Sequence, residues 1–210
     1  MSHPDPLAPP DTRPIEVGEV WENPATLERA VIVDLPWLNA EGSAVAELTA
    51  VPGTRVVGEH MHPALVERFS VEDGELTVLL DGRKSVLGAG ERAEIQPGVW
   101  HYWWNEGDRT AIVRVEITPG ERFVHLVETL FGLAREGHVN KRGMPHALQL
   151  ALLATEFSDI IVFRNPPTAV QRALFGILAP LARRRGYRAT YPSLSRTTLA
   201  TRVPRDTPAG

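Results

Sequence analysis

The sequence contains no cysteine among its 210 residues. Disulfide bridges, thiolate metal sites and cysteine nucleophiles are therefore excluded, and any bound metal must be held by nitrogen and oxygen ligands. Lysine is scarce as well, since Lys84 and Lys141 are the only two. The 22 basic and 26 acidic side chains leave a formal charge of −4. This balance argues against a nucleic-acid-binding protein, which normally carries a basic excess.

Long apolar runs are also missing, because no stretch of the sequence approaches the roughly 18 to 20 residues that a membrane-crossing helix needs. The first six residues have neither the basic nor the apolar region of a signal peptide. Hydrophobic residues make up 43% of the chain and charged residues 23%, as in ordinary globular proteins. We therefore expect a cytoplasmic protein that binds neither nucleic acid nor a membrane.

The composition of the sequence and the spacing of its apolar residues change along the chain. Residues 1–14 hold five of the 18 prolines and predict a disordered or extended arm. Residues 15–118 carry short apolar runs of the kind found in strands, and residues 119–192 change to helical spacing. Residues 193–210 are polar and predict a loose tail.

The apolar runs of residues 15–118 are separated by turn signals. They include residues 30–33, 44–49, 75–80, 92–95 and 110–118. Asp73-Gly74 and Asp81-Gly82 predict hairpins, because glycine allows the positive φ angles of such turns. In the last run, Ala111, Val113, Val115 and Ile117 share one face and Arg114 and Glu116 the other, so one side of this strand should be core. About eight short strands at this spacing predict a mainly β fold, either a sandwich or a barrel.

Residues 119–192 predict about three helices. The first carries an apolar stripe from Phe123 to Leu133. The second starts near Pro145 and is apolar almost all round, so we expect it to be buried within the chain or against another copy. The third starts at a capping box, Thr168–Gln171, and ends in three arginines followed by Gly186. These arginines either complement the helix dipole or form a surface patch that binds anions.

Three histidines and one glutamate make the most informative pattern. His60 and His62 are two residues apart, which places both imidazoles on one face of a strand. Pro63 turns the chain before Glu67, which can come from the next strand. His101 opens a further strand behind a Pro-Gly turn. Such a nitrogen and oxygen set suits one divalent transition metal, namely Fe, Mn, Ni, Co or Zn.

Around these residues the sequence resembles the cupin superfamily over about residues 40–118. The first family motif is matched by Gly53, His60, His62, Glu67 and Gly74, with a gap after Gly53 one residue longer than usual. The second is matched by Gly90, Gly98, His101 and Asn105, with Gln96 where the family often has proline. The resemblance implies a jelly-roll β-barrel, here followed by about three C-terminal α-helices. It also implies that His60, His62, Glu67 and His101 are the metal ligands, although Glu67 can alternatively act as a base.

Strand alternation from the ligands identifies the expected substrate pocket. Phe69, Trp103 and Asn105 fall on the ligand face. The two aromatic residues either line a pocket or fill the barrel, and Asn105 either orients a ligand or caps a turn. A mostly apolar wall favours a small organic molecule over a phosphorylated sugar.

Three functions remain open at this point. The resemblance implies a range of enzymes and non-catalytic binders, and our first hypothesis is a mononuclear non-haem metal oxygenase, a dioxygenase-like oxidoreductase that acts on a small organic molecule. The alternatives are a redox-neutral, metal-dependent isomerase or lyase and a ligand-binding cupin without turnover. Because single-domain cupins commonly pair, and because the second helix is apolar all round, we also predict a homodimer.

Overall fold

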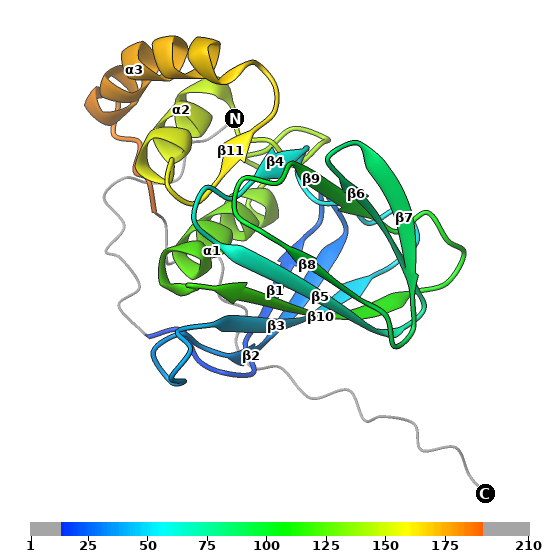
Figure 1. The fold of residues 1–210 in the computed structure, drawn as a ribbon. Helices are drawn as coiled ribbons and strands as arrows, with labels where there is room; N and C mark the ends of the chain where they lie inside the picture. The colour runs from blue at the N-terminus through cyan, green and yellow to red at the C-terminus, as the bar shows by residue number, and fades with distance from the viewer. Residues whose placement is uncertain (1–13, 191–210) are drawn as a thin grey trace, which may run out of the picture.

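The computed structural model describes residues 14–190, and most of these residues belong to two antiparallel β-sheets and three helices (Figure 1). The predicted arm (1–14, Pro14 excepted) and the predicted tail (193–210) lie outside the described residues. None of the described helices is both long and apolar enough to span a membrane. The mainly β prediction is therefore confirmed for the part of the chain that the structure describes.

The two sheets face each other, and the largest apolar cluster of the described residues lies between them. The six-stranded sheet has the order β1 (Val20–Asn23), β2 (Glu28–Asp34), β3 (Ala44–Ala50), β10 (Ala111–Thr118), β5 (Val66–Asp73) and β8 (Arg92–Ile95). The five-stranded sheet has the order β11 (Val162–Phe163), β4 (His60–Met61), β9 (His101–Trp104), β6 (Glu75–Leu80) and β7 (Arg83–Gly88). Large buried side chains such as Phe69, Leu76 and Trp103 fill the space between the sheets.

The two Asp-Gly turns have different outcomes. Asp81 and Gly82 have φ angles of 45° and 79° and close a tight hairpin between β6 and β7, as predicted. The hairpin prediction at Asp73-Gly74 is wrong, because β5 and β6 lie in different sheets. Gly74 forms the corner between the sheets, and a Cβ there would lie 2.5 Å from the Thr110 carbonyl oxygen.

The expected barrel is correct only in part. The described strands form two separate sheets rather than one closed ladder, and the helices are not a simple C-terminal block. α1 (Glu121–Arg135) and α2 (Ala147–Glu156) come first, β11 then returns to the five-stranded sheet, and α3 (Thr168–Arg184) follows. β11 pairs with β4, whose outer edge would otherwise present unpaired backbone groups.

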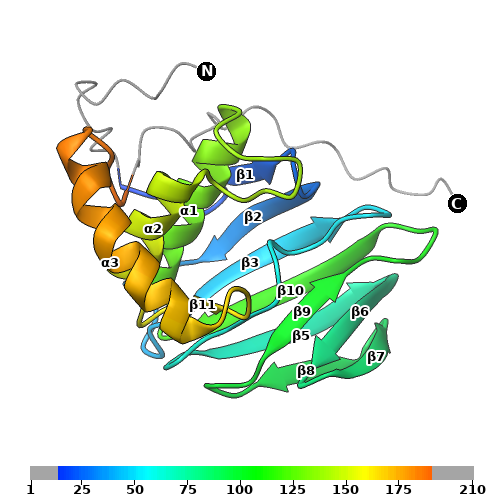
Figure 2. The same ribbon diagram turned by 90° about the horizontal axis from the view of Figure 1, so that it is seen from above.

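The helices gather on one side of the sheets, with α3 outermost (Figure 2). α1 packs on β1 and β2 through a cluster that includes Trp21, Val124 and Phe131. α2 lies between this layer and α3, and Leu152 and Leu153 are both buried. The all-round apolar character of α2 is therefore accounted for within the chain.

The third helix differs from the sequence prediction at its start. Pro167 precedes the first helical residue, and the Thr168 side chain makes no capping hydrogen bond. Gln171 instead donates from Nε2 to the carbonyl oxygens of Phe163 and Pro166. The capping-box prediction is therefore wrong, because the glutamine amide satisfies the preceding loop rather than the helix start.

The end of the third helix follows the prediction. Gly186 has a φ of 84°, its N–H donates to the Arg183 carbonyl, and Tyr187 N–H donates to the Ala182 carbonyl. This pair of bonds is the Schellman ending that glycine favours.

Candidate metal centre

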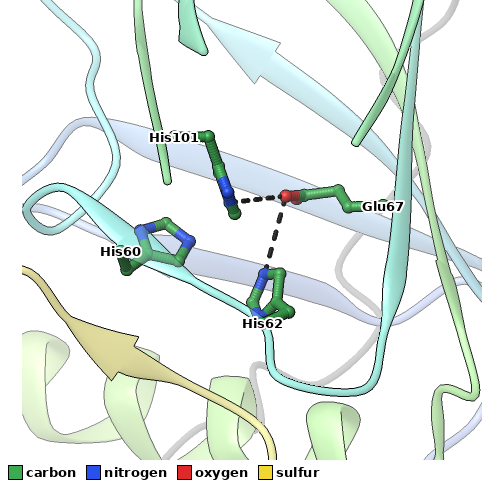
Figure 3. A group of neighbouring side chains, drawn as sticks. All are labelled: His60, His62, Glu67 and His101. Atoms are coloured by element: carbon green, nitrogen blue, oxygen red, sulfur yellow. Dashed lines mark ion pairs between the residues drawn. The ribbon is translucent and has the colours of Figure 1, made fainter. Parts of the chain in front are cut away.

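Three strands, β4, β5 and β9, bring the predicted ligands together between the sheets (Figure 3). His60 on β4 is paired directly with His101 on β9, so their side chains leave the five-stranded sheet side by side. His62 follows β4 immediately, and the turn at Pro63 carries the chain to β5 in the opposite sheet, where Glu67 points back. Alternation along the strand and the proline turn predicted this arrangement correctly.

The potential ligand atoms are close together and buried. All lie within 4.8 Å of one another. Glu67 Oε2 is 3.0 Å from His101 Nε2 and 3.6 Å from His62 Nε2. None of the four residues is more than 5% exposed. Spacings of this size are those expected when nitrogen and oxygen donors, each about 2.1 Å from a metal, surround one ion.

The backbone orients the three imidazoles. The Nδ1 atoms of His60, His62 and His101 lie 2.9, 2.7 and 3.0 Å from the carbonyl oxygens of Gly58, Ile160 and Val99 respectively. Because a carbonyl can only accept a hydrogen bond, each Nδ1 carries the proton and donates it. The Nε2 lone pairs therefore point toward one another, which is the usual arrangement of metal-binding histidines.

This arrangement leaves polar atoms without partners. His62 Nε2, His101 Nε2 and Glu67 Oε2 are buried and have no hydrogen-bond partner. With the protons on Nδ1, these atoms are all acceptors and cannot satisfy one another. Buried polar atoms are rarely left in this state in native proteins. One cation bound by all of them removes the conflict, so the residues present fit a single divalent transition metal.

Burial and mutual charge set the protonation states. Burial, followed by the proximity of His101 and His62, lowers the pKa of His60 to about 3. Burial alone would raise the pKa of Glu67, but the adjacent His101 and His62 imidazoles outweigh burial and lower that pKa. A neutral imidazole and an ionised carboxylate are the forms that bind metal.

A family model for the cupin domain matches residues 46–124, which include all four of these side chains. This part of the chain is a cupin domain. The resemblance seen in the sequence is therefore confirmed, and the cluster can be described as a cupin site that is compatible with one metal ion.

Several solved structures are similar to part of this chain. A Klebsiella pneumoniae protein with a double-stranded β-helix domain is 27% identical, with a TM-score of 0.38; the match covers 51% of this chain and 83% of that protein. A predicted oxalate decarboxylase of Thermotoga maritima is 20% identical, with a TM-score of 0.41 and coverages of 43% and 79%.

A third structure is that of an Acidithiobacillus ferrooxidans protein assigned as a sugar phosphate isomerase. It is 16% identical, with a TM-score of 0.41, and the match covers 45% of this chain. The chain spans 61% of the length of that protein. No curated protein matches this sequence.

The cupin site opens on a cavity of about 140 Å³. His60, His62 and Glu67 lie in its wall, and the rest of the wall is almost entirely apolar. The aromatic part consists of Phe69, Trp103, Phe123, Phe131 and Phe163. Phe69 and Trp103, two of the predicted pocket residues, therefore line this cavity.

The third predicted pocket residue, Asn105, lies outside the lining. Its Nδ2 donates to the carbonyl oxygens of Ala50 and Arg109, and its Oδ1 accepts from Gly107 N–H. These bonds hold the turn that joins β9 to β10. Of the two roles that the sequence left open for Asn105, the structure therefore shows the turn cap, because backbone groups use both ends of the amide.

Sequence reasoning missed the contribution of the helical extension. Phe123 of α1 and Phe163 of β11 complete the cavity wall, and the Ile160 carbonyl holds His62. It also missed Glu28, a buried carboxylate in the same wall. Helical spacing pointed Phe123 inward, but no local pattern linked residues 160–163 or Glu28 to the site.

A larger hollow, of about 630 Å³, lies on the outer face of the six-stranded sheet. Three of its charged side chains pair with one another, since Arg68 binds Glu94 at 2.7 Å and Glu116 at 2.9 Å. None of the four clustered residues lines it. We therefore assign the candidate site to the smaller cavity.

Proposed function

We propose that this cupin is a mononuclear non-haem metal dioxygenase that acts on a small, mostly apolar organic molecule. The observation that carries the proposal is that the candidate metal site and an apolar cavity adjoin each other. A buried cluster of three imidazoles and one carboxylate, suited to a redox-active metal, forms part of the wall of an apolar cavity.

The cavity limits the size of the substrate. A volume of about 140 Å³ is close to that of an engineered protein cavity that binds benzene. The expected substrate therefore has about one ring or a short branched chain. Arginine and lysine are absent from the lining residues, all of which lie in the described part of the chain. Phosphorylated sugars and dicarboxylates, which need basic partners, are accordingly disfavoured.

Side chains of this chain supply binding and water exclusion. His60, His62, Glu67 and His101 would hold the metal, which when bound would supply the redox chemistry that activates dioxygen. Phe69, Trp103 and Phe123 contact the substrate by dispersion and exclude water from the reacting end of the cavity.

A redox-neutral isomerase or lyase is the second candidate, and Glu28 favours it. Burial raises the pKa of this carboxyl to about 7, with a smaller effect in the same direction from Glu67. A group that titrates near neutral pH is suited to proton transfer in a reaction that needs no dioxygen.

The first experiment measures metal content. The protein, purified without a histidine tag or chelator, is expected to contain about one equivalent of a transition metal by elemental analysis. His62→Ala should lose it, because removing one of four ligands leaves the others unable to close the site. His138→Ala changes a histidine outside the cluster and should keep the wild-type content. Metal-free wild-type protein that also fails to take up Fe(II) or Zn(II) would contradict the proposal.

The second experiment separates the two reaction types. Protein is loaded anaerobically with Fe(II) or Zn(II) and then mixed with dioxygen and a panel of monocyclic phenols. A dioxygenase consumes dioxygen only with Fe(II), and His101→Ala should abolish the uptake. Conversion that proceeds equally with Zn(II) and without dioxygen identifies the redox-neutral enzyme. Binding without any conversion identifies the non-catalytic cupin.

A further inference from the structure

Glu28 is a carboxylate in the apolar wall of the cupin cavity and stands apart from the metal cluster. It opens β2, which lies three strands from Glu67-bearing β5 in the six-stranded sheet. The side chain is part of the cavity lining, yet the residue is only 7% exposed. Apart from the clustered residues, Glu28 and Asn23 are the only lining residues of the described chain with a carboxylate or amide group.

Both side-chain hydrogen bonds to the Glu28 carboxylate reach the same oxygen atom. Thr26 Oγ1 donates at 2.5 Å and Asn23 Nδ2 at 3.5 Å, and both reach Oε2. The amide of Asn23 is itself oriented, because its Oδ1 accepts from the N–H groups of Ala25 and Thr26. Oε2 is therefore fixed by a short turn between β1 and β2, and Oε1 is left for a partner in the cavity.

A buried carboxylate with a free oxygen lowers the stability of the folded state, because it loses hydration without gaining a full set of hydrogen bonds. Burial is the main cause of its raised pKa, which shows that the surroundings disfavour the ionised form. An alanine or leucine would fill the same wall without this cost. A ligand that hydrogen-bonds to the free oxygen would compensate for the lost hydration.

We propose that Glu28, with Asn23 beside it, is the polar anchor that selects the ligand of this cavity. The ligand is then a small molecule with an apolar body. One end carries an oxygen that faces the metal cluster, and the other carries a hydroxyl or amine group that donates to Glu28. This inference rests on the proposed function in so far as it places a ligand in the metal-binding cavity.

The test compares molecules of equal size that differ in one polar group. Zn(II)-loaded protein is titrated anaerobically, by calorimetry, with benzene-1,4-diol and with 4-methylphenol. A longer pair, 4-(hydroxymethyl)phenol and 4-ethylphenol, covers a wider span between the two ends of the cavity. In at least one pair the wild type should bind the hydroxylated member about tenfold more tightly, because a hydrogen bond to a carboxylate replaces a buried methyl contact.

Two variants of Glu28 and one matched control assign the effect. Glu28→Leu should reduce the preference to about one or reverse it, whereas Glu28→Gln, which keeps an amide acceptor and the shape, should retain part of it. Glu19→Gln makes the same change at another buried carboxylate, whose oxygens accept from Trp21 Nε1 and Glu16 N–H outside the cavity. That variant should keep the wild-type ratio. Circular dichroism and thermal unfolding check that each variant is folded.

The outcomes separate this inference from the proposed function. Metal content is measured in the same samples, and the titrations are repeated on metal-free protein, where the preference should persist because Glu28 is not a ligand. Protein that fails to bind metal contradicts the proposed function alone. The inference is overturned if the wild type shows no preference or binds none of the four molecules. It is also overturned if Glu28→Leu keeps the wild-type ratio or if Glu19→Gln loses it.

Discussion

The imidazoles of the cupin site owe their orientation to backbone carbonyls at very different distances along the chain. His60 and His101 each donate to the carbonyl two residues earlier, Gly58 and Val99. These contacts are local, so the segment that contains the histidine also positions it. His62 donates instead to Ile160, 98 residues later, between α2 and β11. The helical extension is therefore part of the site, and one ligand depends on it.

Glu28 should give the folded protein a measurable dependence on pH. Its pKa rises from 4.5 to about 7 on folding, mainly through burial. A raised pKa stabilises the folded state below the unfolded-state value, and this stabilisation is lost as the pH rises through the folded-state value. The wild type should therefore lose up to about 3 kcal/mol of stability from this group between pH 4.5 and pH 7.

The Glu28→Gln variant isolates that effect, because glutamine does not titrate. Contributions from other groups, including the opposite ones expected of His60 and Glu67, are shared by both proteins and cancel in the difference. Urea unfolding of both proteins at pH 4.5, 6 and 8 should show the variant gaining relative stability as the pH rises. A difference in unfolding free energy that does not change with pH would contradict the assignment.

At the scale of elements, Gly74 decides where the chain leaves one sheet for the other. Its φ is 72°, and a Cβ would meet the Thr110 carbonyl oxygen at 2.5 Å. Gly74→Ala should therefore destabilise the fold by roughly 2–4 kcal/mol, through backbone strain and overpacking together. Equilibrium denaturation measures this loss.

Gly82 provides the matched control. Its φ is 79°, but a Cβ there would have no atom within 4 Å. Gly82→Ala should therefore cost only the backbone strain, about 1–2 kcal/mol. Equal losses in the two alanine variants would show that the corner at Gly74 is not sterically demanding.

The two Asp-Gly pairs also mark a limit of sequence reading at this scale. Both have the local conformation that the dipeptide predicts, with positive φ at the glycine. Only Asp81-Gly82 joins two strands of one sheet. Whether such a turn makes a hairpin or a corner depends on where the next strand finds a partner, which the dipeptide does not encode.

For the whole molecule, the homodimer predicted from the sequence stays a prediction, but its expected surface changes. α2 is covered by α3, so it is not the free face. α3 buries Phe175, Ala179 and Ala182 and leaves an apolar stripe exposed, with Ile177 at 73%. The other members of this stripe are Val170, Leu174 and Leu181. A second copy is expected to cover the stripe, because exposed apolar patches of this kind commonly mark protein interfaces.

Ile177→Asp tests this surface. A charge at the most exposed position of the stripe should shift a dimer toward monomer in sedimentation velocity, while metal content stays at the wild-type level. Val86→Asp is the control, since Val86 is also exposed, at 46%, but lies on β7 away from the helices. A wild type that sediments as a monodisperse monomer would contradict the homodimer.

The amino-acid sequence by itself determined the β-rich region, the helical spacing that follows it and the four clustered side chains. Each of these depends on a short-range rule, such as alternation along a strand, the period of a helix or the turn at a proline. Phe69 and Trp103 could be placed in the cavity by the same alternation from neighbouring ligands.

The tertiary structure alone decided the rest of the site. Three of its contacts join residues that are far apart in the chain. β11 pairs with β4, the Ile160 carbonyl accepts a hydrogen bond from His62, and Glu28 lines the cavity. These contacts depend on how whole elements pack, because burial of apolar surface is non-directional and satisfies many pairings in principle. The hydrogen bonds of Asn105 show the same limit, since an amide can serve a ligand or a turn equally well until the surrounding backbone is in place.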